Sequence, residues 1–283
     1  MLSIIYGLFA AIGWGAGDFT GGLASRKAGA YRTVLYGEIV GIFFLFLVIM
    51  FVGESIPDRR SWMLAMLAGA FGTVGLMFLY HAMTLGLMSI ATPVSALLAA
   101  TLPVLIGLFR EGFPGIETII GFGFALFAVW MISQSAGGVM DTLRVSHLSS
   151  LKLPLLAGIG FGFYFVLMGE ATSTGATIWP MVASRSGGMT LIVTYMLVTR
   201  SSWKVKDKSA WPMITLNGIL DISGNLFFIL ASQAGRLDVA AVLSSLFPGA
   251  TVVLAWIFLK ERLSLNQWLG IGSALIAIVL MTI

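Results

Sequence analysis

The chain has 283 residues, of which 58% are hydrophobic and 10% charged, with a formal net charge of +4 and a mean hydropathy of +0.99. Soluble domains carry about 25% charged residues, so this composition excludes a water-soluble globular protein and indicates a chain that lies mostly in lipid. The sequence has no cysteine, which excludes disulfides, a thiol nucleophile and a cysteine-bound metal.

Ten apolar stretches follow one another along the chain, and each has about the length that crosses a bilayer. A transmembrane helix needs about 20 mainly apolar residues, whereas a barrel strand needs about 10. Because only helices and closed barrels satisfy the backbone in lipid, these lengths predict helices. The sequence therefore predicts an all-α membrane protein with ten transmembrane helices, at Leu2–Leu23, Thr33–Val52, Trp62–Thr84, Ser89–Phe109, Ile116–Ser133, Leu153–Glu170, Thr177–Thr199, Trp211–Ala234, Val239–Leu259 and Gln267–Ile283.

The two halves of the chain repeat one another at an offset of 149 residues, which places Leu67 over Leu216 and Gly121 over Gly270. Each half holds an odd number of predicted spans, so the second half enters the membrane in the opposite direction. A duplication of this kind is typical of secondary transporters, which bind their substrate between the halves. We predict two inverted five-helix repeats at 1–136 and 152–283, joined by a linker at 137–151.

Lysine and arginine are distributed unequally over the predicted loops. Cytoplasmic loops of membrane proteins carry an excess of these residues. The richer side is therefore predicted to be cytoplasmic, which places both termini outside an integral plasma (inner) membrane protein. The richer side carries Arg26, Lys27, Arg32, Arg144, Lys152, Arg200, Lys204, Lys206, Lys208, Lys260 and Arg262, and the poorer side carries Arg59, Arg60, Arg110 and Arg236.

Local motifs in both halves resemble the ten-helix EamA type of the drug/metabolite transporter superfamily. The Gly/Ala-rich first helix holds a Trp14-Gly15 pair, and the second half ends with Pro248, the loop acid Glu261 and the Gly270 helix. The first half departs from this pattern, because it has no proline at the place that matches Pro248.

This resemblance implies a ten-helix fold that transports small solutes across the membrane. Members of the superfamily carry amino acids, sugars, nucleotide sugars or cationic drugs, so the resemblance does not select the substrate. It also implies cytoplasmic termini, opposite to the charge distribution, and we keep the charge distribution as our prediction.

Three ionisable residues of the first half are predicted to lie at one depth. Charged groups inside the membrane cost roughly 2.5–3.5 kcal/mol each, so they indicate a functional site. Two carboxylates and an imidazole together would share a proton near neutral pH. The alternative is an interfacial arrangement in which the acids pair with Arg26, Lys27 or Arg32. The three residues are Asp18, Glu38 and His81.

Asn217, Asp221 and Asn225 recur every four residues and so share one face of the eighth predicted helix. Their counterparts in the first half are apolar or glycine, so the scaffold does not require polar groups there. This asymmetry favours a cavity-lining role, while interhelical hydrogen bonding is the alternative.

Arg185 lies about eight residues into the seventh predicted helix and needs an anion there. The candidates are Glu170, Asp221 and the carboxylate of a substrate. We predict that Arg185 meets the Asn217–Asp221–Asn225 face in one central cavity between the halves.

Aromatic and proline residues complete the predicted site. Five aromatic side chains are candidates for a cavity wall, although each is individually compatible with packing or interfacial anchoring. Three prolines are candidates for hinges, because proline kinks a helix. The aromatics are Trp14, Tyr36, Tyr80, Tyr164 and Trp179, and the prolines are Pro93, Pro103 and Pro248.

The sequence predicts a secondary transporter, either proton-linked or facilitative, that exports small metabolites by alternating access, with amino-acid-like solutes favoured. An efflux pump for cationic aromatic drugs is the nearest alternative, and a membrane enzyme or lipid scaffold is a remote one. No phosphate loop or metal-spaced histidine cluster occurs in the sequence. We therefore expect no catalytic residues, metal, cofactor or nucleic acid, and a monomer or homodimer that contacts only lipid and a small-molecule substrate.

Overall fold

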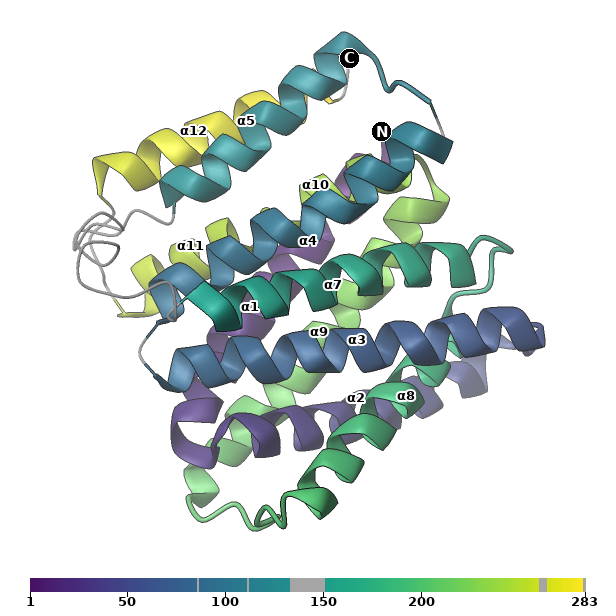
Figure 1. Ribbon diagram of the computed structural model, residues 1–283, viewed down its shortest axis with the longest axis vertical. Coiled ribbons are helices and arrows are strands. Elements are labelled where there is room, and N and C mark those ends of the chain that lie inside the picture. Colours follow the sequence, from purple (N-terminus) through teal and green to yellow (C-terminus); the bar gives the residue numbers. More distant parts are fainter. Residues whose placement is uncertain (86, 111, 133–150, 260–263, 282–283) are drawn as a thin grey trace.

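The computed structural model describes residues 1–85, 87–110, 112–132, 151–259 and 264–281 (Figure 1). This part of the chain is helical, with short connections and no strand. The linker predicted at 137–151 lies outside the described residues except for Leu151, and so does the loop acid Glu261. The helices are α1 (Leu2–Ala28), α2 (Ala30–Val52), α3 (Arg59–Thr84), α4 (Met88–Arg110), α5 (Ile116–Ile132), α7 (Lys152–Ala171), α8 (Ile178–Val198), α9 (Trp211–Gln233), α10 (Leu237–Ser244), α11 (Phe247–Leu259) and α12 (Leu265–Leu280), with a short 3-10 helix, η2 (Lys208–Ala210).

The predicted all-α membrane protein is confirmed by these helices. Eight helical segments of the described chain have the length and hydropathy to cross a membrane, with α10 and α11 together forming one of them. The shorter apolar helices α5 and α12 occupy the positions of the fifth and tenth predicted spans. Large apolar side chains such as Phe43, Phe51 and Phe109 lie exposed on the outside of the bundle. Such a surface is suited to lipid and not to water.

The ninth predicted span, Val239–Leu259, is not one continuous helix. It is divided into α10 and α11 by a turn at Ser245 and Leu246. Pro248 lies in the first turn of α11, where its missing N–H is not needed, so the chain starts a new helix there. Pro93 and Pro103, by contrast, lie inside the unbroken helix α4. The hinge role of the three prolines stays a prediction, and the two halves differ in how they use them.

Helices of one half pack against helices of the other half. Helix α1 packs on α9, α10 and α11, and its counterpart α7 packs on α3 and α4 (Figure 1). Helices α5 and α12 lie side by side at one edge of the bundle. This exchange of equivalent partners is what a two-fold axis between the halves produces.

The α5–α12 contact shows the relative direction of the two halves. A Cβ on Gly121 would lie 3.2 Å from the carbonyl oxygen of Ala277, and one on the equivalent Gly270 would lie 2.9 Å from that of Ala128. Ala128 and Ala277 are themselves equivalent under the 149-residue offset. The contact is therefore reciprocal and antiparallel, and the inverted arrangement of the two five-helix repeats stays a prediction.

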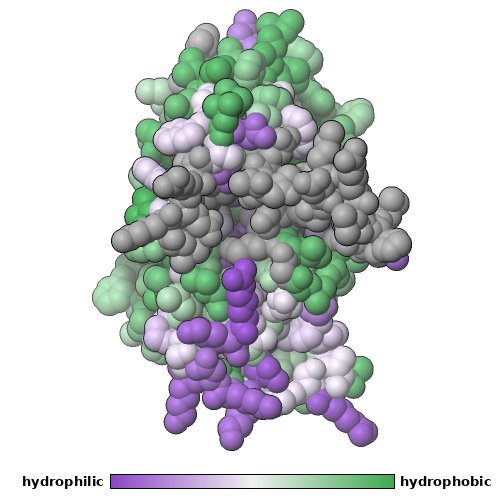
Figure 2. Space-filling view, turned by 90° about the vertical axis from the view of Figure 1, so that its left-hand side faces the viewer, coloured by the Kyte–Doolittle hydropathy of each residue, from purple (hydrophilic) through white to green (hydrophobic). Residues whose placement is uncertain are grey.

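Lysine and arginine gather at one end of the bundle. The connection from α1 to α2 binds the connection from α8 to α9 there, since Lys27 donates to Ser209 at 3.0 Å and Arg32 donates to the carbonyl of Ser202 at 2.6 Å. Figure 2 views this end, and hydrophilic residues cover its lower part. At the opposite end, Glu170 accepts from Arg60. The structure thus separates these basic residues into two ends as the sequence predicted, and which end is cytoplasmic stays a prediction.

Candidate functional site

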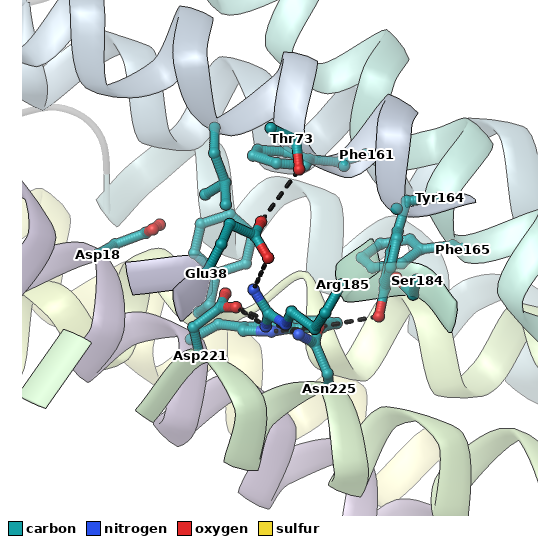
Figure 3. A pocket seen from close by; sticks show the side chains of 15 residues that line it. Asp18, Glu38, Thr73, Phe161, Tyr164, Phe165, Ser184, Arg185, Asp221 and Asn225 are labelled. Atoms are coloured by element: carbon teal, nitrogen blue, oxygen red, sulfur yellow. Dashed lines mark hydrogen bonds and ion pairs between the residues drawn. The ribbon is translucent and has the colours of Figure 1, made fainter. Parts of the chain in front are cut away.

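A cavity lies between the two halves, about midway along the helices (Figure 3). Water centres can occupy about 60 Å³ of it. One buried water needs roughly 10–15 Å³ of such space, so the cavity holds only a few waters. It is lined by Trp14, Asp18, Glu38, Gly69, Gly72, Thr73, Leu76, Phe161, Tyr164, Phe165, Ser184, Arg185, Asp221, Asn225 and Phe247.

Arg185 of α8 is shared between two carboxylates at one side of this cavity. Its Nη1 donates to Glu38 Oε2 of α2 at 2.8 Å, and its Nη2 pairs with Asp221 of α9. Glu38 Oε1 also accepts from the Thr73 hydroxyl at 3.0 Å. Arg185 is 6% exposed and Glu38 is 4% exposed. The arrangement links both halves of the protein through one guanidinium, which donates to one carboxylate from each half (Figure 3).

Glycines make room for this charged cluster. A Cβ on Gly188 would lie 2.2 Å from the Thr73 hydroxyl, and one on Gly41 would lie 3.4 Å from Arg185 Nε. At the crossing of α3 and α8, a Cβ on Gly69 would lie only 1.8 Å from the carbonyl oxygen of Ser184. Small residues of this kind let membrane helices approach closely. Close approach of α8 to α2 and α3 is what brings Arg185 within reach of Glu38.

Asn225 of α9 joins two aromatic side chains of the cavity wall, Trp14 from the first half and Tyr164 from the second. Its side-chain oxygen accepts from Trp14 Nε1 at 3.1 Å and from the Tyr164 hydroxyl at 2.9 Å. Its amide nitrogen donates to Asp221 at 3.2 Å. Trp14 also stacks on Phe165, with ring centroids 5.3 Å apart. Asn225 therefore fixes the aromatic wall relative to the charged cluster.

Asn217, one turn before Asp221, lies beside the cavity and not on its wall. Its amide donates to the carbonyl of Gly17 at 2.9 Å and to the Tyr80 hydroxyl at 2.8 Å. Tyr80 is 1% exposed. This layer ties α1, α3 and α9 together on the side of the cavity that faces the lysine- and arginine-rich end.

Packed apolar clusters flank the cavity toward both ends of the bundle. One cluster contains Phe165, Phe228 and Met181 and lies toward the end that carries Arg60. Another contains Leu79 and Met196 and lies toward the end that carries Arg32. A solute that moves between the cavity and either end must therefore pass close to one of these clusters.

Asp18 of α1 has a different environment from the other acids. It is 7% exposed and lines the cavity, and its carboxylate points toward Glu38 (Figure 3). In the described part of the chain, no hydrogen bond or ion pair joins it to another residue. Nor do Lys27 and Arg32 neutralise it, because they bind Ser209 and the carbonyls of Ala28 and Ser202.

The structure does not bring His81 to the depth of Glu38. Glu38 contacts Thr73, which lies two turns before His81 on α3, and His81 stacks on Tyr31 near the end of that helix. The expected arrangement of His81, Asp18 and Glu38 at one depth is therefore wrong. The cause is the position of each residue along its helix, since Glu38 lies eight residues after the start of α2 at Ala30, whereas His81 lies three residues before the end of α3 at Thr84.

Two of the five predicted wall aromatics also lie elsewhere. The Tyr36 hydroxyl donates to the carbonyl of Trp203 at 2.8 Å, and Trp179 Nε1 donates to the carbonyl of Glu54 at 2.8 Å. Both are interfacial contacts near the ends of helices. Tyr80 belongs to the Asn217 layer, while Trp14 and Tyr164 line the cavity.

Sequence reasoning missed several wall residues. Thr73 is a hydroxyl within an apolar span and directly follows Gly72, and this signal is weak because threonine often bonds its own helix. Ser184 immediately precedes Arg185 and was detectable by that position. Nothing in the sequence singled out Phe161, Phe165 or Phe247 among the 20 phenylalanines. Within the described residues, no group of three or more acidic or histidine side chains is arranged to hold a metal.

A central polar cavity between two paired halves of a helical membrane protein defines the class of small-solute transporters. The chain belongs to the EamA-like transporter family, whose family model matches residues 1–134 and 148–283. This confirms the resemblance drawn from the sequence motifs and supports a transporter over an enzyme.

Two relatives and one solved structure resemble the chain. The "Putative ribose uptake protein RbsU" of Staphylococcus epidermidis is 25% identical over 240 residues, covering 82% of this chain and 79% of that protein. The "Uncharacterized protein MJ1333.1" of Methanocaldococcus jannaschii is 33% identical over 79 residues, 28% of this chain and 58% of that protein. A crystal structure aligns with a TM-score of 0.78 and 17% identity, covering 99% of this chain and 98% of the other, which shows a common fold.

Proposed function

We propose that this transporter carries a small, uncharged polyhydroxylated solute, with a pentose as the first candidate, by alternating access. The observation that carries this proposal is that Arg185 is held by both Glu38 and Asp221 in the central cavity. A solute carboxylate would add a third negative charge beside this single guanidinium, whereas a hydroxylated solute adds none. The relative named for ribose uptake supports the same class of solute.

The cavity wall suits a sugar ring. Binding sites for small solutes combine apolar and aromatic walls with a few polar groups that fix orientation. Trp14 and Tyr164 offer ring faces and edges, while the carboxylates accept hydrogen bonds from hydroxyl groups and Arg185 donates to them. A polyol provides both donors and acceptors, so it can satisfy this mixed set without adding charge.

Alternating access follows from the position of the cavity between the halves. The space for a few waters is too small for a pentose in the closed, empty state, so binding must widen it. Because Arg185 holds Glu38 of the first half and Asp221 of the second, a solute that inserts between them separates the halves. This gives binding a direct effect on the packing of α2 and α9.

A zwitterionic, amino-acid-like solute is the second candidate. The specific observation in its favour is the guanidinium of Arg185 in the cavity, which would grip a carboxylate bidentately. On this alternative, Asp18 or Asp221 would bind the ammonium group. Lipophilic aromatic cations, which the acids and rings would also attract, are the third class to test.

The test is transport into liposomes that contain the purified protein. We expect labelled D-ribose to enter faster than into protein-free liposomes, and other small polyols to compete with it. Arg185→Met provides the matched inactive control, with its folding checked by size-exclusion chromatography. Accumulation of L-amino acids or tetraphenylphosphonium instead of D-ribose would overturn the proposal.

The direction and the orientation are tested separately. The sequence favoured export, whereas the relative is named as a putative ribose uptake protein, so flux is measured from both sides of the membrane. For orientation, we propose that the α8–α9 connection is cytoplasmic in the plasma membrane, because it belongs to the basic end. Since the chain lacks cysteine, Ser202→Cys and Ser173→Cys report the two ends without background. An impermeant thiol reagent on intact cells should label only Ser173→Cys, and the reverse pattern would invert the orientation.

A further inference from the structure

Asp18 is the acid of the cavity that the charged cluster does not use. Asp18 is 7% exposed as a residue, and its carboxylate points into the cavity from α1. Glu38 has two partners and Asp221 has two, whereas Asp18 has no hydrogen-bond or ion-pair partner within the described ranges. An ionised carboxylate buried without a partner is strongly disfavoured, and such a group takes up a proton instead.

The surroundings of Asp18 hold no free positive charge in the part of the chain that the structure describes. From α9 it is faced by Asp221 and Asn217, from α2 by Glu38, and from α3 by Tyr80. Arg185 of α8 is the one cation of the cavity wall, and both of its anionic partners are in place. The neighbouring part of α11 contributes Thr251, whose hydroxyl bonds the backbone of α1.

The charge balance of the closed cavity depends on Asp18. Arg185 carries one positive charge against the two negative charges of Glu38 and Asp221, so an ionised Asp18 would add a second excess negative charge. With little water in the cavity, this charge is poorly screened. When the cavity opens, water enters and can solvate the carboxylate, so the ionised form is then tolerated.

We propose that Asp18 takes one proton from water each time the empty cavity closes, which makes it the proton-coupling group of the transport cycle. The proposal rests on the alternating access described above. The proton passes to a carboxylate oxygen of Asp18 when an apolar cluster closes over the cavity, and it leaves when the cavity opens on the other side. No other group of the cavity changes its charge in this step.

A bound solute changes this requirement. A solute hydroxyl that donates to Asp18 satisfies the ionised carboxylate, so the loaded cavity closes without a proton. Net transport, which includes return of the empty protein, should therefore depend on pH, whereas exchange of solute for solute should not. Because the proton and the solute move in opposite directions in this scheme, an inward proton gradient drives export.

The first experiment detects the proton without any solute. Infrared spectra of the purified protein in liposomes should show the carbonyl band of a protonated carboxylic acid at neutral pH. Asp18→Asn should remove this band, whereas Glu170→Gln, which alters a carboxylate paired with Arg60 at the end of the bundle, should leave it. A band that Asp18→Asn leaves unchanged would overturn the proposal.

The second experiment follows closure of the cavity. Ser184→Cys places a thiol on the cavity wall. Ser202→Cys places a thiol on the exposed α8–α9 connection, and its labelling rate corrects for the effect of pH on the reactivity of a thiol. The ratio of their labelling rates with a small thiosulfonate should rise with pH, by up to about tenfold per pH unit for a single proton. Asp18→Asn should keep the ratio low at every pH, and Asp18→Glu should restore the pH dependence.

Two controls separate this inference from the proposed solute. His81→Ala should leave the pH dependence of labelling unchanged, because His81 lies outside the cavity. If D-ribose is not transported but the labelling and infrared results are as expected, the proposed solute is rejected and the role of Asp18 is retained. A ratio that responds to sodium and not to pH, or that keeps its pH dependence in Asp18→Asn, would reject the role of Asp18 whatever the solute.

Discussion

Helices α3 and α9 occupy equivalent places in the two halves, and both line the central cavity, yet they present different chemistry to it. Helix α3 presents Gly72 and Leu76, where α9 presents Asp221 and Asn225. At the crossing with a neighbouring helix they agree, since Gly69 and Gly218 are equivalent and both contact a carbonyl oxygen closely. The repeat therefore specifies how the helices cross, and the substrate chemistry differs between its two copies.

This difference has a physical basis. A polar side chain within a membrane needs a partner, and two symmetric charged sites would need two sets of partners. One charged cluster shared across the halves satisfies its members through Arg185, while α3 adds no charge to the wall and contributes the Thr73 hydroxyl beside Gly72 and Leu76. The comparison predicts that substitutions at the equivalent glycines Gly69 and Gly218 lower the stability of the fold. Substitutions at Asp221 and Asn225 should instead change solute binding.

The largest effect is expected from Arg185→Leu. Removing the guanidinium leaves Glu38 and Asp221 buried without a cation, and breaking such a pair costs about 3–5 kcal/mol. Thermal unfolding in detergent should show this loss, and transport should stop. Adding Glu38→Gln and Asp221→Asn to the variant should recover most of the stability without transport, because no unpaired charge remains. A single variant as stable as the unaltered protein would show that the cluster does not hold the halves together.

The next effect compares the equivalent glycines of the two crossings. A Cβ on Gly69 would lie 1.8 Å from the carbonyl oxygen of Ser184, whereas one on Gly218 would lie 2.7 Å from that of Gly37. Both contacts are with backbone, which cannot move aside locally. We expect Gly69→Ala to cost about 3 kcal/mol and Gly218→Ala about 1 kcal/mol of stability, by the usual range for overpacking. Equal unfolding temperatures for the two variants would mean that the crossings are interchangeable.

A smaller effect follows from making α9 resemble α3. Asn225→Leu introduces the residue type of Leu76 and leaves the Trp14 and Tyr164 donors without their acceptor. Each unsatisfied donor costs about 1–3 kcal/mol, so the stability and the apparent affinity for solute should both fall. Tyr164→Phe added to this variant should cost less than Tyr164→Phe alone. Additive costs would contradict the shared role of Asn225.

The smallest effect is expected at His81. Because its ring packs on Tyr31 at a helix end, His81→Ala should change stability by within about 1 kcal/mol and leave the pH profile of transport intact. Asp18→Asn is the matched comparison, since it should flatten that profile. A flattened profile in His81→Ala would return this histidine to the proton path.

The sequence by itself determined the features that depend on local composition and on the repeat. The apolar lengths predicted ten spans and an all-α membrane fold, and the 149-residue offset predicted the paired halves that the α5–α12 contact reflects. The cost of charge in lipid pointed to Arg185 and Asp221 before any contact was visible. These inferences need only the hydropathy and spacing of residues.

The tertiary structure decided which polar groups meet. Close approach of the helices at Gly69 and Gly188 accompanies the pairing of Glu38 with Arg185 and Thr73, while His81 lies near the end of α3 and outside the cavity. They also leave Asp18 without a partner in the described chain. Depth counted from a loop cannot predict these outcomes, because a small rotation or tilt of a helix moves a side chain from the cavity to a neighbouring interface.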